Sequence, residues 1–143
     1  MPPSTINILL DNDVFFSALN QTHKHYTRAR PWLNKAKAAG WGIAIETYLA
    51  AVRMFMNPAI MGANTQTAAA AINLVELELS GPHPGDVLHS TARPSAAILG
   101  RATGHKQIMD YWLVQLARQS GCKLATLDAG TLANWPADTL RIP

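Results

Sequence analysis

INILLDND, residues 6–13, is the stretch that decides the fold of this 143-residue chain. Ile6 to Leu10 form a short run rich in branched apolar residues, which is typical of a strand buried on both faces of a sheet. Two carboxylates, Asp11 and Asp13, follow this run at once. The stretch therefore predicts a buried strand with acidic side chains where it ends.

Further short apolar runs follow along the chain, separated by segments with helical periodicity. Strands are predicted at Trp41–Ile45 (WGIAI) and in CKLATLD, residues 122–128, with a shorter one at VLH, residues 87–89. The predicted helical segments are residues 14–20, 22–40, 46–58, about 64–79, 94–102 and 106–121. Strands that alternate with helices predict an α/β fold with a mainly parallel sheet and helices on both faces.

Glycine, proline and polar residues mark the expected ends of these helices. Gly40 and Gly121 are placed to end two helices, and Pro58 to end a third. Asn64 or Thr65 is the expected N-cap of the alanine-rich helix that follows.

Length and composition fit one globular domain spanning residues 1–143. Hydrophobic residues make up 48% and charged residues 15% of the chain, which excludes an acidic or polar disordered protein. The sequence contains neither an apolar run of membrane-spanning length nor a signal-peptide pattern, so we expect a cytoplasmic protein. The single cysteine, Cys122, is expected to be a buried thiol.

Four of the nine acidic residues form the candidate site. Asp11, Asp13 and Asp128 follow predicted parallel strands, whose carboxyl ends share one edge of the sheet, and Asp110 lies near the start of a predicted helix. Carboxylates gathered without cations have raised pKa values, so we expect such a cluster to bind a metal or share protons. An oxygen-only donor set favours Mg²⁺, with Mn²⁺ as the alternative.

The order ILLDNDVFFSAL, THKHYTRARPWL, RMFMNP and GHKQIMDYWLVQLARQSGCKLATLD resembles the PIN-domain family, most closely the VapC-type toxin ribonucleases. The resemblance covers nearly the whole chain and implies a PIN-like three-layer sandwich. It matches Asp11 to the first metal-binding acid, Asp110 to the acid of the TDxxLxxLA-like helix and Asp128 to the acid that closes the next strand. It implies a Mg²⁺-dependent endoribonuclease that cleaves RNA with metal-activated water, with Asp11 and Asp110 as metal ligands.

The same resemblance implies two protein partners, a cognate antitoxin and a second copy of the chain in a homodimer. The apolar residues Phe15, Phe16, Met54, Phe55 and Met56 are candidates for part of a partner groove. On the segment 22–40, the side chains of Arg28, Arg30, Lys35 and Lys37 are either a solvated face or contacts for RNA phosphates.

Two positions depart from the family pattern. Asp13 stands where the family has Asn, and Tyr48 stands where the TExxFxRxxxNP pattern has Glu. Glu46 lies two residues earlier, about 200° away on a regular helix. Asp13 or Glu46 could compensate for Tyr48; alternatively, the chain is a catalytically degenerate module that binds RNA or an antitoxin.

A further enzymatic alternative takes DND as the Asp-x-Asp motif of a haloacid-dehalogenase-like phosphatase. Asp11 would then be the nucleophile and Asp13 the acid. Phe15 stands where that family prefers a small hydroxyl or aliphatic residue, no convincing Lys and paired-acid motif follows, and the chain is short.

Overall fold

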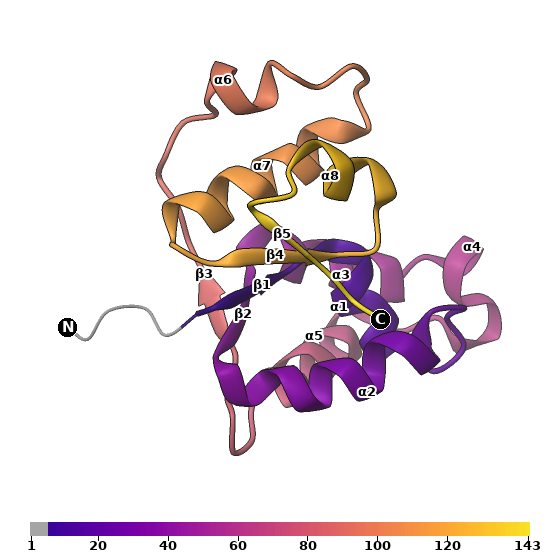
Figure 1. Cartoon of the computed structure of the whole chain (residues 1–143). Helices are drawn as coiled ribbons and strands as arrows, with labels where there is room; N and C mark the ends of the chain where they lie inside the picture. Colours follow the sequence, from indigo (N-terminus) through magenta and orange to yellow (C-terminus); the bar gives the residue numbers. More distant parts are fainter. Residues whose placement is uncertain (1–5) are drawn as a thin grey trace.

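The computed structural model describes residues 6–143, and its centre is a sheet of five parallel strands (Figure 1). The strands are β1 (Ile8–Leu10), β2 (Trp41–Ala44), β3 (Asp86–Leu88), β4 (Lys123–Thr126) and β5 (Thr139–Arg141). Their order across the sheet is β3-β2-β1-β4-β5, which places β1 at the centre. Leu9 on β1 is fully buried and pairs in register with Gly42 on β2 and Leu124 on β4.

Helices cover both faces of this sheet, and each face has its own hydrophobic core. Leu10, Ile43 and Ala125 pack with the first group of helices, and Leu9, Ala44 and Leu124 pack with the second. The first group is α1 (Asn12–Leu19), α2 (Tyr26–Ala36), α3 (Ile45–Phe55) and α5 (Ala68–Leu79); the second is α6 (Ala96–Leu99), α7 (Gln107–Gln119) and α8 (Ala129–Asn134). The structure therefore confirms the predicted α/β three-layer sandwich.

Several element boundaries differ from the sequence predictions. α2 begins at Tyr26 rather than near Thr22. α5 begins at Ala68 because the Thr67 side chain, rather than Asn64 or Thr65, caps it by accepting a hydrogen bond from the Ala70 backbone N–H. The structure also contains α4 (Pro58–Met61), α8 and β5, none of which was predicted. Gly40 and Gly121 end their helices as predicted, with φ of 92° and 69°.

Two of the four basic side chains expected on the surface of segment 22–40 link that segment to α5 instead. Arg30 donates two hydrogen bonds to the Glu78 carboxylate, at 2.7 and 2.8 Å, and Lys37 contacts the same carboxylate. This ion-pair cluster is mostly shielded from solvent. Arg30 on α2 and Lys37, which follows the end of α2, therefore connect this segment to α5 and are not a solvated face.

The prediction that these apolar residues line part of a partner groove is wrong for most of them. Phe15, Phe16 and Phe55 lie in the core between the sheet and the first group of helices, and Met54 is half-buried. Of the five apolar residues proposed for the groove, Met56 is the one that the structure leaves exposed.

Cys122 is buried as predicted, and burial raises the pKa of its thiol to about 11. Over residues 6–143, none of the helices combines the length and apolar character that a membrane crossing requires.

Candidate active site

Asp11 is the most buried carboxylate of the candidate site. It follows β1 directly, is the N-cap of α1 and is 3% exposed. One carboxylate oxygen accepts a hydrogen bond from the Asn12 backbone N–H at 2.7 Å, and the other accepts one from the Thr126 hydroxyl at 2.7 Å. Because Thr126 ends β4, these contacts fix Asp11 at the carboxyl edge between two central strands.

The other three predicted acids lie around this edge. Asp13 is exposed in the first turn of α1, and Asp110 is half-buried in the first turn of α7. Asp128 follows β4 and caps α8, where its Oδ2 accepts hydrogen bonds from the Thr131 backbone N–H at 2.8 Å and the Thr131 hydroxyl at 2.7 Å. Strand order and helix placement thus bring residues from three separate parts of the chain to one edge.

The charges of the four carboxylates act on one another at this edge. Burial, followed by the charges of Asp11, Asp128 and Asp13, raises the pKa of Asp110 to about 7. Burial also raises the pKa of Asp11 to about 6, with smaller contributions from the charges of Asp13 and Asp128, although the hydrogen bonds from Thr126 and Asn12 act in the opposite direction. Mutual repulsion of this kind is relieved when a cation binds.

The four carboxylates fit a hard divalent cation in charge and in donor chemistry. However, within residues 6–143 no group of three or more His, Cys, Asp or Glu side chains is arranged so that it could hold a metal ion. Both oxygens of Asp11 and one oxygen of Asp128 already accept hydrogen bonds from the protein. The four carboxylates lie at one edge of the sheet, but their oxygen atoms do not converge on a common point.

Glu46 and Tyr48 point in different directions from α3. The Glu46 Oε1 atom accepts a hydrogen bond from Trp112 Nε1 on α7 at 3.2 Å, and its Oε2 atom is buried without a hydrogen-bond partner in the described part of the chain. Tyr48 instead faces α5: burial raises the pKa of its hydroxyl, and the hydrogen-bonded Glu76 carboxylate raises it further. Glu46 is therefore the α3 carboxylate that reaches the edge between the two helical layers.

A cleft beside Asp13 extends the site along α3. The residues that line it come from α1, from α3 and from the N-cap of α4; they are Asn12, Asp13, Ala50, Arg53, Met54 and Asn57. Glu46, Ala50 and Arg53 are spaced so that they share one face of α3. The cleft thus combines a carboxylate with a guanidinium, a pairing suited to a phosphate group held beside a bound cation.

Sequence reasoning missed Thr126 as a functional contact. Its hydroxyl accepts a hydrogen bond from the Asp128 backbone N–H at 3.0 Å while donating to Asp11. The available signal was the position of Thr126. It is a hydroxyl residue at the end of a buried strand, two residues before an acid, and from there it can contact the residue that follows the neighbouring strand.

Comparison with known proteins identifies the family. No family model matches the chain. It is 30% identical over 125 residues to the ribonuclease VapC38 of Mycobacterium tuberculosis H37Rv, with 85% of both chains covered. It is also 30% identical over 128 residues to the ribonuclease VapC29 of the same species, covering 87% of this chain and 88% of the relative. The chain belongs to the VapC family, as the sequence motifs predicted.

Asp110→Asn is predicted to stabilise the metal-free protein at about pH 8 and to weaken its pH dependence. A carboxyl whose pKa rises from 3.8 to about 7 on folding binds more protons in the folded state than in the unfolded state over that range. The contribution of Asp110 should therefore lower the free energy of unfolding of wild type as the pH rises from about 4 to 7. The whole of this decrease should be present above pH 7. Urea unfolding in EDTA across this range measures the effect.

Asp86→Asn is the matched control, because it removes an exposed carboxylate at the first residue of β3. That residue lies at the end of the sheet where the strands begin, away from the acids. It should leave the pH slope unchanged. An Asp110→Asn protein with the same slope as wild type would show that the site does not perturb Asp110.

Proposed function

We propose that this protein is a metal-dependent endoribonuclease and the toxin of a type II toxin–antitoxin pair. The observation that carries the proposal is the placement of Asp11, Asp13, Asp110 and Asp128 around one sheet edge in a chain of the VapC family. Mg²⁺ is commonly bound by one or two carboxylates and keeps several waters, so we further propose that Asp11 and Asp110 hold Mg²⁺, or Mn²⁺ in its place, with Asp13 and Asp128 beside them. Such an ion supplies activation of water and stabilisation of charge on the phosphodiester.

Each carboxylate has a separate task in this proposal. Asp11 is oriented by Thr126 and Asn12, so its position is fixed before any ligand arrives. Asp110 has a pKa of about 7 and releases its proton when a cation lowers the local negative potential. Asp128, held by Thr131, supplies negative charge at the neighbouring strand.

We assign the role of the missing family glutamate to Glu46 rather than to Asp13 alone. The support is its unpartnered buried oxygen and its contact with α7, the helix that carries Asp110. Tyr48 is turned toward Glu76 on α5, so the substitution at this position does not place a tyrosine among the acids. These contacts of Glu46 and Tyr48 favour an active enzyme over a degenerate binding module. Family membership likewise argues against the phosphatase interpretation.

The cognate antitoxin and the homodimer remain part of the proposal. Exposed apolar side chains on α3 and α5 support a protein partner on that side of the molecule: Leu49 is 56% and Leu77 71% exposed. Burying such side chains stabilises a protein complex through the hydrophobic effect.

The proposed activity predicts metal-dependent cleavage of RNA by the purified, partner-free protein. Titration with Mg²⁺ or Mn²⁺ should produce cleavage of a mixed structured RNA pool, and Asp11→Asn should lower the rate by at least about 100-fold. Metal binding without cleavage in wild type would instead identify a binding module. Equal cleavage by wild type and Asp11→Asn would remove Asp11 from the mechanism.

Glu46→Gln tests the assignment of the fifth carboxylate. It keeps the hydrogen bond from Trp112 but removes the charge, so cleavage should fall by about 10-fold or more at limiting Mg²⁺ and recover in part at higher metal concentration. Tyr48→Phe is the matched control on the same helix and should cleave RNA like wild type. The assignment fails if Tyr48→Phe lowers cleavage and Glu46→Gln does not.

A further inference from the structure

We propose that single-stranded RNA reaches the acidic site along a basic path made by Arg141 at the end of β5 and by Arg28, Trp32 and Lys35 on α2. This inference rests on the proposed ribonuclease function and states how the same site holds its substrate. Four carboxylates at one edge repel a polyanion, so cations must lie beside them for RNA to bind. The structure places such cations on the β5 side of the site.

Arg141 lies in the row of residues that contains Asp11. β4 and β5 pair in parallel with Thr126 opposite Arg141, and the Thr126 hydroxyl donates to Asp11. Adjacent strands are about 4.8 Å apart, so the Arg141 backbone is about two strand spacings from that of Asp11. Arg141 is exposed and is therefore free to reach a phosphate that approaches the acids.

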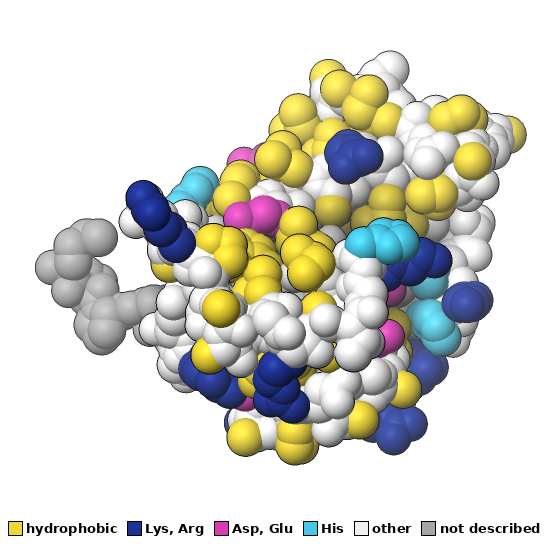
Figure 2. Space-filling model, turned by 90° about the horizontal axis from the view of Figure 1, so that it is seen from above, with side chains coloured by type: hydrophobic (Ala, Val, Ile, Leu, Met, Phe, Trp, Pro, Cys, Tyr) yellow, Lys and Arg dark blue, Asp and Glu magenta, His cyan; other side chains and the backbone are white. Residues whose placement is uncertain are grey.

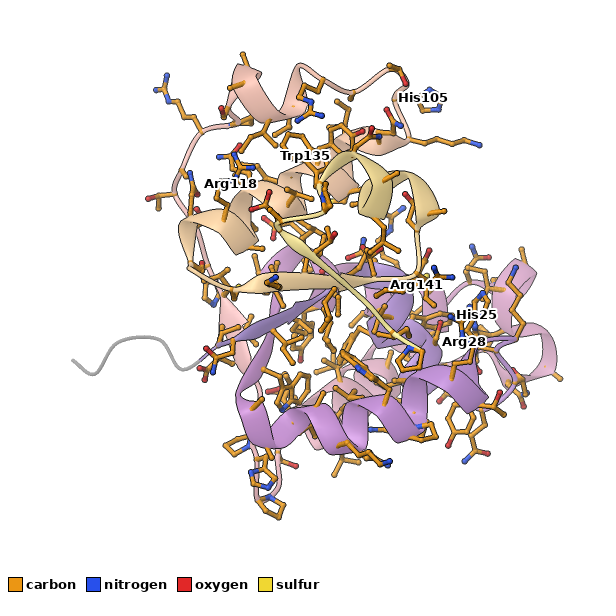
Figure 3. All side chains as sticks on the ribbon, viewed as in Figure 1. His25, Arg28, His105, Arg118, Trp135 and Arg141 are labelled. Carbon is orange, nitrogen blue, oxygen red and sulfur yellow. The ribbon has the colours of Figure 1, made fainter. Side chains whose placement is uncertain are left out.

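Arg28 connects this strand end to the start of α2. Its guanidinium donates hydrogen bonds to the backbone carbonyls of Pro143 at 3.1 Å and Ile142 at 3.3 Å. Figure 3 shows Arg141, Arg28 and His25 together on the side of the molecule where β5 ends. The loop before α2 also borders the acids, because the charge of Asp13 acts on His23, which contacts Ser17 of α1.

Basic and acidic side chains therefore meet at this end of the sheet. At the right of Figure 2, histidine and Lys/Arg side chains lie beside acidic ones. This arrangement is suited to a ligand that carries phosphates along a chain and presents one of them to the acids.

A groove continues from this cluster along α2. Its lining residues are Thr27, Arg28, Pro31, Trp32, Lys35 and Pro143. Trp32 is half-buried and provides an aromatic surface between two exposed cations, Arg28 and Lys35. Aromatic rings that stack on bases, flanked by cations that contact phosphates, are the usual means of binding single-stranded RNA.

Arg141→Ala and Lys35→Ala test the two ends of the path, with Lys123→Ala as the matched control. Lys123 is exposed and begins β4, so the control removes one positive charge from the opposite edge of the same sheet. All variants are compared in an Asp110→Asn background, so that the RNA stays intact. The probe is a fluorescein-labelled single-stranded RNA oligonucleotide, and anisotropy is measured over a series of KCl concentrations.

Arg141→Ala and Lys35→Ala should each weaken RNA binding several-fold and reduce the slope of log K against log salt by about 0.7. Lys123→Ala should change neither quantity. If Arg141→Ala or Lys35→Ala binds RNA as tightly as Lys123→Ala does, the proposed path is overturned. A weaker complex with an antitoxin in the same variant would not rescue it. The proposed ribonuclease function is tested separately. If wild type cleaves RNA with Mg²⁺, that function stands whatever the Arg141→Ala and Lys35→Ala variants show. If wild type neither binds nor cleaves RNA, both proposals fail.

Discussion

The hydrogen bond from the Thr126 hydroxyl to the buried Asp11 carboxylate is the contact on which the candidate site depends. A carboxylate that is 3% exposed is costly unless its oxygens have donors, and Asp11 has one on each oxygen. The two donors come from the start of α1 and the end of β4, so the bonds join the central strand to its neighbour. The same contact that satisfies a buried charge therefore sets the position of the acid around which the other carboxylates are arranged.

The remaining acids follow from topology. Because all five strands are parallel, their carboxyl ends share one edge, and the residues after β1, β2 and β4 meet there. α7 packs on the opposite face of the sheet from α1 and α3, and its first turn brings Asp110 to the same edge. The Trp112 to Glu46 hydrogen bond links α7 to α3 across this edge. The fold thus concentrates negative charge at one end of the sheet, while Arg141 and Arg28 supply positive charge beside it.

The central strands could be predicted because buried parallel strands appear as short apolar runs, and Asp11, Asp13 and Asp128 could be placed because they follow those runs. Asp110 lies on a helix, and the family resemblance was what matched it to the site. β5 and α8 could not. β5 has three residues and begins with the polar Thr139, and α8 has six residues that include Gly130 and Asn134, which are poor helix formers. Because β5 was missed, Arg141 was missed with it. The choice between Glu46 and Tyr48 was open for a different reason: helical spacing shows that the two side chains diverge, but only packing shows that Glu46 contacts α7 and that Tyr48 faces α5.

The most direct measurement of the central claim is X-ray diffraction from crystals grown with Mn²⁺. If the coupled carboxylates form a cation site, an anomalous difference map should contain a peak in contact with Asp11 and Asp110 at the carboxyl edge of the sheet, and crystals of Asp110→Asn should lose it. A map without a peak at this edge, from crystals whose other sites are occupied by Mn²⁺, would contradict the account.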